Sequence, residues 1–298
     1  MSLTANDPLA ARLPRREYAR TGKHLSVIGF GGIIVMNETP EFSAAIVQEA
    51  VDRGVNYFDV APSYGDAQAK LGPALEPHRK DVFLACKTAE RTAKGAAADL
   101  ERSFELLRTD YFDLYQLHAI TDVAKDVEQV FAPGGAFEPI LEAKAAGRLK
   151  ALGVSAHSVE AAMAALDRYP FDSVLFPVNF ATFHKGGFGP ALLERCKRDG
   201  VSVLALKAMA RQKWTDGHPK RERWNKCWYE PLDEPETAAL AMRFTLGMGV
   251  TSALPPGHAE LWRMALDTFT GTEPLTDAEL DSLKARAEEL DPIFAASA

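Results

Sequence analysis

Hydrophobic residues in this chain form eight short runs, and between the runs the apolar positions recur at helical spacing. The runs are continuously apolar instead of alternating, which is typical of parallel strands covered by helices. We predict strands at residues 27–32, 56–60, 81–87, 111–118, 149–155, 173–179, 201–206 and 250–254. We predict helices at residues 41–53, 67–75, 94–108, 135–146, 159–166, 191–198, 236–246, 258–268 and 277–290.

The order of these elements predicts an α/β protein with a single domain, a (β/α)8 TIM barrel. Eight strand and helix units in 298 residues, without a break in composition, suit a closed barrel. We expect the barrel to span residues 15–298, after a poorly ordered leader at residues 1–14. An open doubly wound sheet is the alternative, and it would carry a GxGxxG phosphate loop after its first strand. The segment from Gly29 to Gly32 lacks that spacing, which favours the barrel.

Composition narrows the class of protein. The net charge of −7 and the sequence pI near 5.6 give no reason to expect a nucleic-acid partner. Three widely spaced cysteines without a CxxC pair argue against disulfides and structural zinc, and they indicate a reducing, cytoplasmic compartment. No apolar run is long enough to span a membrane. Arg15 and Arg16 precede an apolar segment, but glycines interrupt that segment and disfavour an export signal. The oligomeric state is left open.

Polar residues stand where six successive predicted strands end. The carboxyl ends of barrel strands meet at one rim, which is where TIM barrels carry their chemistry. The residues at these ends are Asp59 with Tyr64 just beyond it, Lys87, His118, Ser155, Asn179 and Lys207.

Four of these residues form a set with a recognisable chemistry: Asp59, Tyr64, Lys87 and His118. A tyrosine is a weak acid near neutral pH, but a nearby ammonium favours the phenolate and lowers the phenol's pKa. A carboxylate beside the lysine would keep the lysine charged, and a histidine could orient a substrate oxygen. The set is suited to protonating an oxygen on which negative charge develops, such as a carbonyl that receives a hydride. None of the four has metal-ligand spacing.

The motifs around these residues resemble those of the aldo-keto reductase superfamily over nearly the whole chain. The matching stretches are RTGKHLSVIGFGG, DVAPSYG, FLACKT, LYQLHAI and GRLKALGVSAHS. The resemblance implies hydride transfer from NAD(P)H to an aldehyde or ketone, with Tyr64 as general acid. It implies that Lys87, paired with Asp59, lowers the pKa of Tyr64, and that His118 orients the carbonyl.

The resemblance also implies a nicotinamide cofactor, NADP(H) more than NAD(H), bound across the barrel mouth. The implied cofactor contacts are Gly32, Ser155, Asn179, Leu206, Lys207, Met209, Gly257, His258 and Arg263. The chain departs from the family pattern at Ala156, Leu175 and Leu206, where asparagine, glutamine and an aromatic residue are usual.

Residues 211–231 form a long polar segment without predicted structure, rich in aromatic residues. One interpretation makes this segment an active-site lid, with an aromatic wall for the substrate; the other makes the aromatics anchors that pin the loop to the barrel. The candidate wall residues are Trp214, Trp224, Trp228 and Tyr229. His157 and His184 have no partner in the pattern, and we expect them at the surface.

Two other functions remain open at this level. The chain could bind a nicotinamide cofactor as a redox sensor or regulatory subunit with little turnover. A lyase or isomerase on the same barrel would need a metal or phosphate site, which the pattern does not offer.

Overall fold

The computed structural model describes residues 13–296, so most of the predicted leader, residues 1–12, lies outside the described part. Leu13 is buried, and the carbonyl of Pro14 accepts a hydrogen bond from the backbone of Val27. The folded domain therefore begins before residue 15, the predicted boundary.

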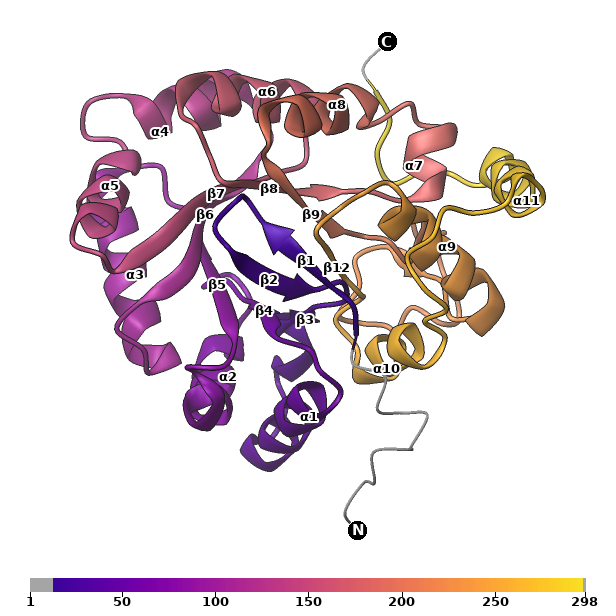
Figure 1. Ribbon diagram of the computed structural model, residues 1–298, viewed down its shortest axis with the longest axis horizontal. Helices are drawn as coiled ribbons and strands as arrows, with labels where there is room; N and C mark the ends of the chain where they lie inside the picture. The colour runs from indigo at the N-terminus through magenta and orange to yellow at the C-terminus, as the bar shows by residue number, and fades with distance from the viewer. Residues whose placement is uncertain (1–12, 297–298) are drawn as a thin grey trace.

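Eight parallel strands form one sheet that curls into a barrel, as predicted (Figure 1). In spatial order each strand pairs with its neighbours in the chain, apart from the small hairpins. The barrel strands are β3 (Phe30–Gly31), β4 (Tyr57–Asp59), β5 (Phe83–Thr88), β6 (Phe112–Ile120), β7 (Leu149–Ala156), β8 (Ser173–Pro177), β9 (Ser202–Leu206) and β12 (Ser252–Leu254).

The barrel closes between its first and last strands. Ile28 forms a parallel bridge with Ala253, and the backbone of Gly29 donates to the carbonyl of Ala253 at 3.0 Å. The first strand is shorter than predicted, because only Phe30 and Gly31 pair with β4. Gly32, predicted at the strand end, begins the 3-10 helix Gly32–Val35 instead.

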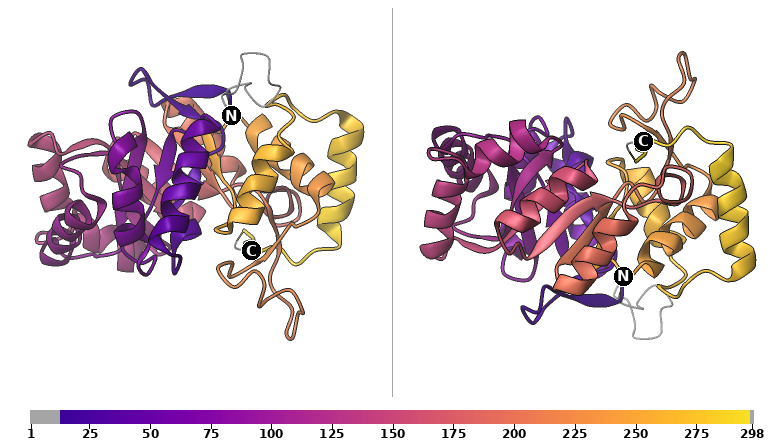
Figure 2. Two further views of the ribbon diagram at one scale, coloured as in Figure 1. Left: turned by 90° about the horizontal axis from the view of Figure 1, so that it is seen from below. Right: turned by 90° about the horizontal axis from the view of Figure 1, so that it is seen from above.

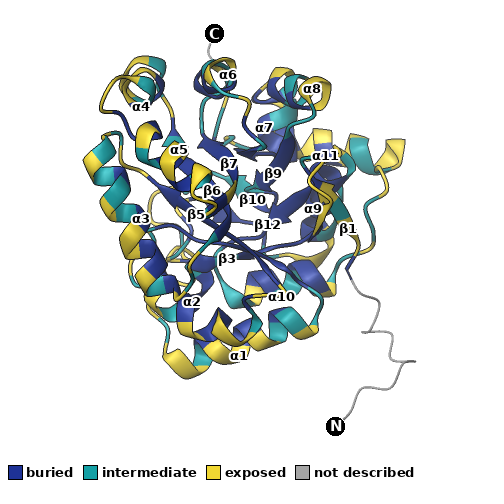
Figure 3. Cartoon of the chain, turned by 60° about the vertical axis from the view of Figure 1, so that its left-hand side comes forward, coloured by how far each residue is buried: buried dark blue, intermediate teal, exposed yellow. Residues whose placement is uncertain are grey.

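Helices surround the barrel and cover it from solvent (Figure 3). Their apolar sides pack on the strands, while their outer faces are exposed, which is the burial pattern expected of a TIM barrel. The helices are α1 (Pro40–Asp52), α2 (Ala67–Leu75), α3 (Ala93–Leu107), α4 (Gln129–Phe131), α5 (Phe137–Ala145), α6 (Val159–Arg168), α7 (Phe180–His184), α8 (Pro190–Asp199), α9 (Pro235–Gly247), α10 (Ala259–Asp267) and α11 (Asp277–Glu288). A 3-10 turn at Glu76–His78 and a π-helix at Val123–Glu128 complete the set.

An unpredicted hairpin of β1 (Arg15–Tyr18) and β2 (Lys23–Ser26) covers the amino end of the barrel. Tyr18 is fully buried, and its hydroxyl donates to Ser173 at 2.9 Å. Its ring joins the apolar side chains inside the barrel, including Tyr57 and Phe83. The hairpin thus closes the end opposite to the carboxyl rim, so the rim is the open face.

The long segment after β9 is not without structure, contrary to prediction. Strands β10 (Ala210–Gln212) and β11 (Glu230–Pro231) pair at its base. Figure 2 shows this segment projecting from the barrel on the side away from the β1–β2 hairpin. It therefore stands over the carboxyl rim.

Candidate active site

The carboxyl rim brings the four predicted residues together. Asp59 is the last residue of β4, Lys87 lies near the end of β5, and His118 lies near the end of β6, while Tyr64 follows in the turn before α2. Asp59, Tyr64 and His118 line a cavity of about 230 Å³ that also contacts Lys207 and Trp228. This space is called the rim cavity below. Because the strands are parallel, their ends meet at one place although they are far apart in sequence.

Lys87 and Asp59 form a buried ion pair beneath the rim cavity. Lys87 is fully buried, its ammonium donates to Asp59 Oδ1, and it lies 3.3 Å from the carbonyl of Val60. Burial alone would lower the pKa of Lys87, but the charge of Asp59 raises it, and the net shift is upward. The lysine is therefore an ammonium at neutral pH.

Asp59 is fixed by two neighbours that sequence reasoning missed. Tyr57 donates its hydroxyl to Asp59 Oδ2 at 3.1 Å, and Gln116 donates its amide to the same oxygen at 3.0 Å. Tyr57 is two residues before Asp59, and Gln116 is two residues before His118. Side chains two apart on a strand share a face, so the alternation along β4 and β6 could have placed both inside the barrel.

The Tyr64 side chain lies above this ion pair. The ammonium of Lys87 is 5.2 Å from the centre of the Tyr64 ring. Burial raises the pKa of Tyr64 above its ordinary value, and the charge of Lys87 opposes that rise. Lys87 acts in the predicted direction, but desolvation of the phenolate outweighs the ammonium, so the net shift is upward. Tyr64 is a protonated phenol at neutral pH.

His118 faces Tyr64 across the rim cavity. The two rings meet edge to face with centres 5.8 Å apart, and Ser63 Oγ lies 3.4 Å from His118 Nδ1. Burial lowers the pKa of His118 to about 3, and the charge of Lys87 lowers it further in the same direction. The imidazole is neutral at physiological pH and can donate one N–H.

Four of the predicted cofactor residues line the rim cavity: Ser155, Leu206, Lys207 and Gly257. Lys207 has a left-handed backbone, with φ at 66°, and its side chain is half-buried. Burial lowers the pKa of Lys207 to about 8. Gly257 packs so closely on Ile33 that a Cβ at this position would come within 2.4 Å of the isoleucine side chain.

The other predicted cofactor residues do not line the rim cavity. Gly32 and Met209 are buried beside it, and Asn179 caps helix α7, with its amide nitrogen buried and unpaired among the described residues. His258 accepts a hydrogen bond from the backbone of Lys226 at 3.1 Å. Arg263 is bound to Glu49 of α1 at 2.7 Å.

The residues present fit a dinucleotide. Helix α10 has no side-chain cap at His258, so its first backbone N–H groups are free to bind phosphate. Asn179 offers a buried amide without a partner, and a Cβ on Gly31 would meet no atom within 4 Å. Open backbone N–H groups, an unpaired amide and a glycine-lined wall suit phosphates, a carboxamide and a flat ring.

The aromatic residues of the 211–231 segment divide into two pairs. Trp228 and Tyr229 line the rim cavity. Trp214 donates its indole N–H to the carbonyl of Cys227, and buried Trp224 donates to Asp233, so this pair anchors the segment. Trp214 and Trp224 are therefore anchors, while Trp228 and Tyr229 lie where a substrate wall would stand.

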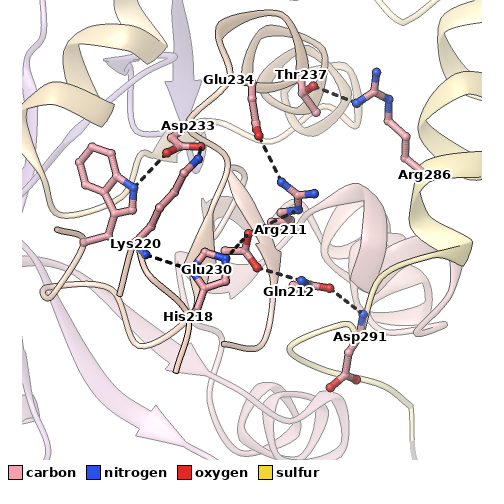
Figure 4. Close-up of polar contacts among 11 residues, drawn as sticks. Arg211, Gln212, His218, Lys220, Glu230, Asp233, Glu234, Thr237, Arg286 and Asp291 are labelled. Atoms are coloured by element: carbon pink, nitrogen blue, oxygen red, sulfur yellow. Dashed lines mark hydrogen bonds and ion pairs between the residues drawn. The ribbon is translucent and has the colours of Figure 1, made fainter. Parts of the chain in front are cut away.

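A polar network stiffens the segment internally (Figure 4). Glu230 accepts from Gln212 at 2.8 Å and lies 3.7 Å from the imidazole of His218. Lys220 bonds Asp233 at 2.8 Å. These contacts join the two ends of the segment, so it is an ordered loop held by its own polar contacts.

His157 is not a surface residue, contrary to prediction. It directly follows β7 and lines the rim cavity. Burial lowers the pKa of His157 to about 4, and its ring stacks on Phe294 with centres 5.4 Å apart. His184 is also half-buried, against Phe183 and Phe244. His157 was missed because its place depends on the C-terminal segment, which the local pattern does not reveal.

Larger hollows of about 670 and 470 Å³ lie near the amino end of the barrel, around Arg20 and Gly200. Neither contacts any of the four predicted catalytic residues. We assign the candidate active site to the smaller rim cavity, because, among the cavities of the described residues, this one is lined by Tyr64 and His118 and lies above buried Lys87. Within residues 13–296, no cluster of three or more His, Cys, Asp or Glu side chains is arranged to hold a metal ion.

Comparison with known proteins agrees with this geometry. The model of the Aldo/keto reductase family matches residues 27–240. The aldo-keto reductase YhdN of Bacillus subtilis is 33% identical over 161 residues, 48% of this chain and 46% of that protein. L-galactose dehydrogenase of Arabidopsis thaliana is 25% identical over 252 residues, 77% of this chain and 74% of that protein. The chain spans about half the length of YhdN and of the oxidoreductase YqkF from the same bacterium.

The fold has solved counterparts as well. The holo form of aldo-keto reductase AKR11C1 from Bacillus halodurans superposes with a TM-score of 0.72 at 20% identity, over 92% of this chain and 96% of that one. This likeness shows the barrel fold. The family match over residues 27–240 shows that the chain belongs to the aldo/keto reductase family, which is a family of oxidoreductases.

No helix between residues 13 and 296 combines the length and apolar character that crossing a bilayer requires.

Proposed function

We propose that this chain reduces an aldehyde or ketone to an alcohol with NAD(P)H, and that Tyr64 is the general acid. The observation that carries the proposal is the meeting of Tyr64, His118 and Asp59 at one cavity, above buried Lys87. A phenol next to an ammonium and a neutral imidazole is the arrangement that protonation of a developing alkoxide needs.

The reaction divides among the side chains as follows. When bound, the reduced nicotinamide supplies the hydride. His118, neutral because of its burial, donates a hydrogen bond to the carbonyl oxygen and orients it. Tyr64 transfers its proton to that oxygen, and Lys87 stabilises the phenolate until solvent restores the proton. Asp59 holds Lys87 charged and in place, with Tyr57 and Gln116 fixing the carboxylate.

The cofactor would lie across the rim, held by Ser155 and Asn179 at the carboxamide and by the open amino end of α10 at the phosphates. We favour NADP(H) over NAD(H), because Arg263 is one helical turn from that amino end and could exchange Glu49 for a ribose phosphate. Equal KM values for NADPH and NADH would contradict this preference. The remaining predicted cofactor residues would support the binding site: Gly32, Leu206, Met209 and His258.

The 211–231 segment would act as a lid over the bound cofactor. Lys226 supports this role, because its ammonium donates to Glu38 at 2.7 Å and to the carbonyl of Ile34 at 3.0 Å. This contact ties the segment to the turn after β3, so that it passes over the end of β12, which lies between β9 and β3. Trp228, which is exposed, and Tyr229 would form the substrate wall.

A sensor or regulatory subunit with little turnover is not favoured. Such a protein has no need of a buried lysine and aspartate that pair under a phenol, and this pair is complete here. Three free cysteines, all buried among the described residues, support a reducing compartment such as the cytoplasm. The proposed partner is a small carbonyl compound.

The substitution Tyr64→Phe tests the proposal, since it removes only the proton donor. We expect loss of aldehyde-dependent NADPH oxidation by at least about 1,000-fold, with cofactor affinity nearly unchanged in a fluorescence titration. Tyr169→Phe is the matched control, because Tyr169 packs against Phe137 and Phe171 on the outside of the barrel. Normal turnover in Tyr64→Phe would refute the role of the phenol.

A further inference from the structure

The rim cavity carries an excess of positive charge. Among the described residues, the one carboxylate in its wall is that of Asp59, which already binds Lys87. Lys226 also lines the cavity, but Glu38 neutralises it. Lys207 is the remaining cation, and among the described residues no carboxylate lies close enough to shift its pKa.

The surroundings of Lys207 hold the ammonium in place without neutralising it. Its Nζ lies 5.3 Å from the ring centre of Trp228 and 5.2 Å from that of Tyr229. Aromatic faces attract a cation, yet this attraction is weak and does not replace a counter-ion. The left-handed backbone of Lys207 adds strain, and such strain is commonly retained at binding sites.

We propose that Lys207 binds a carboxylate on the substrate, so that the preferred substrates are small aldehydes or ketones that also carry an acid group. This inference rests on the proposed reductase function and names its substrate class. The carbonyl end would face Tyr64 and His118, and the acid end would face Lys207. The cavity volume of about 230 Å³ restricts such a substrate to a small molecule.

The neighbours of Lys207 favour the substrate over the cofactor phosphates as its ligand. Lys207 lines the same cavity as His118, and its ammonium lies against Trp228 of the proposed substrate wall, so it faces the space where the carbonyl compound would bind. The residues suited to a dinucleotide, Gly257 and the amino end of α10, follow β12. A cofactor phosphate on Lys207 is the competing outcome, and kinetics can separate the two.

The test compares two aldehydes of equal chain length, succinic semialdehyde and butanal, which differ in the terminal carboxylate. We expect kcat/KM to favour the acid by about 10- to 100-fold in the unmodified protein, as a charged hydrogen bond would give. Lys207→Met should abolish this ratio, and Lys207→Arg should keep most of it. Lys226→Met is the matched control, because it removes a cavity lysine that already has a partner, and it should leave the ratio intact.

Each contrary result overturns a specific statement. If the unmodified protein reduces neither aldehyde, the proposed reductase function fails. If it reduces butanal as well as the semialdehyde, only the carboxylate site fails. If Lys207→Met keeps the ratio but raises the KM for NADPH with both aldehydes, Lys207 serves the cofactor and the inference is wrong. If Lys226→Met also abolished the preference in kcat/KM for the semialdehyde, the overall positive potential of the rim cavity, and not Lys207, would select the acid.

Discussion

The guanidinium of Arg91 donates through Nη2 to the backbone carbonyl of His118 at 2.9 Å. The same nitrogen lies 3.4 Å from the carbonyl of Ala119, and Nε binds Asp126 at 2.9 Å. At this point β6 bulges, since the register with β7 shifts between Leu117 and Ile120. Ala119 takes a left-handed backbone, with φ at 54°. Arg91 therefore clamps the bulge that aims His118 into the rim cavity.

Arg91→Lys should lower catalysis through the position of His118. Lysine keeps the charge but cannot reach Asp126 and both carbonyls with a planar fork. We expect kcat to fall about tenfold with little change in the KM for NADPH. Arg79→Lys is the control: Arg79 forms a comparable buried pair with Asp113 at 3.0 Å, but at the amino end of the barrel. Equal losses of kcat in both variants would show that stability, not the aim of His118, is responsible.

The pH profile of kcat/KM should show no decline caused by protonation of His118. Because the pKa of His118 is lowered to about 3 by burial, its protonation is complete only in strong acid. We expect kcat/KM for butanal to stay level between about pH 5 and 8, without an inflection near 6.5. Tyr64, whose pKa burial raises, should lose its proton only above its ordinary value, so any alkaline decline from the phenol begins above about pH 10. An acid limb near pH 6.5 would mean that His118 is solvated during turnover.

Lys207→Met should stabilise the protein. A half-buried ammonium without a carboxylate disfavours the folded state, and an apolar side chain of similar length removes that cost. We expect the free energy of unfolding at pH 7 to rise by about 1–4 kcal/mol in urea titrations. Lys213→Met, which removes a solvent-exposed pair with Asp291, should change it by less than about 0.5 kcal/mol.

This gain should depend on pH in a defined direction. The folded pKa of Lys207 is about 8, below its ordinary 10.5, so the unfolded chain holds the proton more tightly. The cost of the charge is complete below pH 8 and fades as pH rises toward 10.5. The difference between Lys207→Met and the unmodified protein should therefore shrink over that window, and a growing difference would contradict the assignment. The ionisable groups near Lys207 are Lys87, His118, His157, Cys227 and Tyr229.

Lys226→Met should loosen the lid. Without this ammonium the 211–231 segment loses its contacts to Glu38 and Ile34 in the turn after β3. We expect NADPH to dissociate about tenfold faster in stopped-flow fluorescence. Lys220→Met removes a contact to Asp233 within the segment's own framework, as Figure 4 shows, and should leave the dissociation rate unchanged. Identical rates in all three proteins would end the lid hypothesis.

Gly72→Ala should destabilise the barrel. Gly72 lies where α2 presses on α3, and a Cβ there would come within 2.1 Å of the carbonyl oxygen of Leu106. Overpacking of this kind costs about 1–3 kcal/mol, which exceeds the gain of roughly 1 kcal/mol in helix propensity. In Gly95→Ala the three atoms nearest the new methyl group all belong to the Glu90 side chain, which can rotate away, so thermal denaturation should show little loss. A normal melting temperature for Gly72→Ala would show that the two helices can separate.

Most of the barrel was predictable, because its strands are uninterrupted apolar runs with helical periods between them. The β1–β2 hairpin was not, since two positions of its turn with positive φ are Ala19 and Arg20, and only the third, Gly22, is a residue that usually marks such a turn. Strands β10 and β11 are too short to leave a periodic signal.

The meeting of Asp59, Tyr64, Lys87 and His118 followed from their places at strand ends. Their supports could not be predicted in the same way. Arg91 reaches the carbonyl of His118 from another loop, and no local pattern encodes such a contact. The net shift in the pKa of Tyr64 could not be predicted from the sequence either, because it depends on how completely the phenol is desolvated.

The pairing of Ile28 with Ala253 determines when, during synthesis of the chain, the barrel can close. Beside it, Ser252 donates its hydroxyl to the carbonyl of Ser26, a residue 226 positions earlier. A ribosome must therefore release the polypeptide at least as far as Ala253 before the barrel can close. Until then the sheet of the nascent chain has two edge strands with unpaired backbone groups. A premature stop ahead of Val250 would leave these edges unpaired and prone to aggregation.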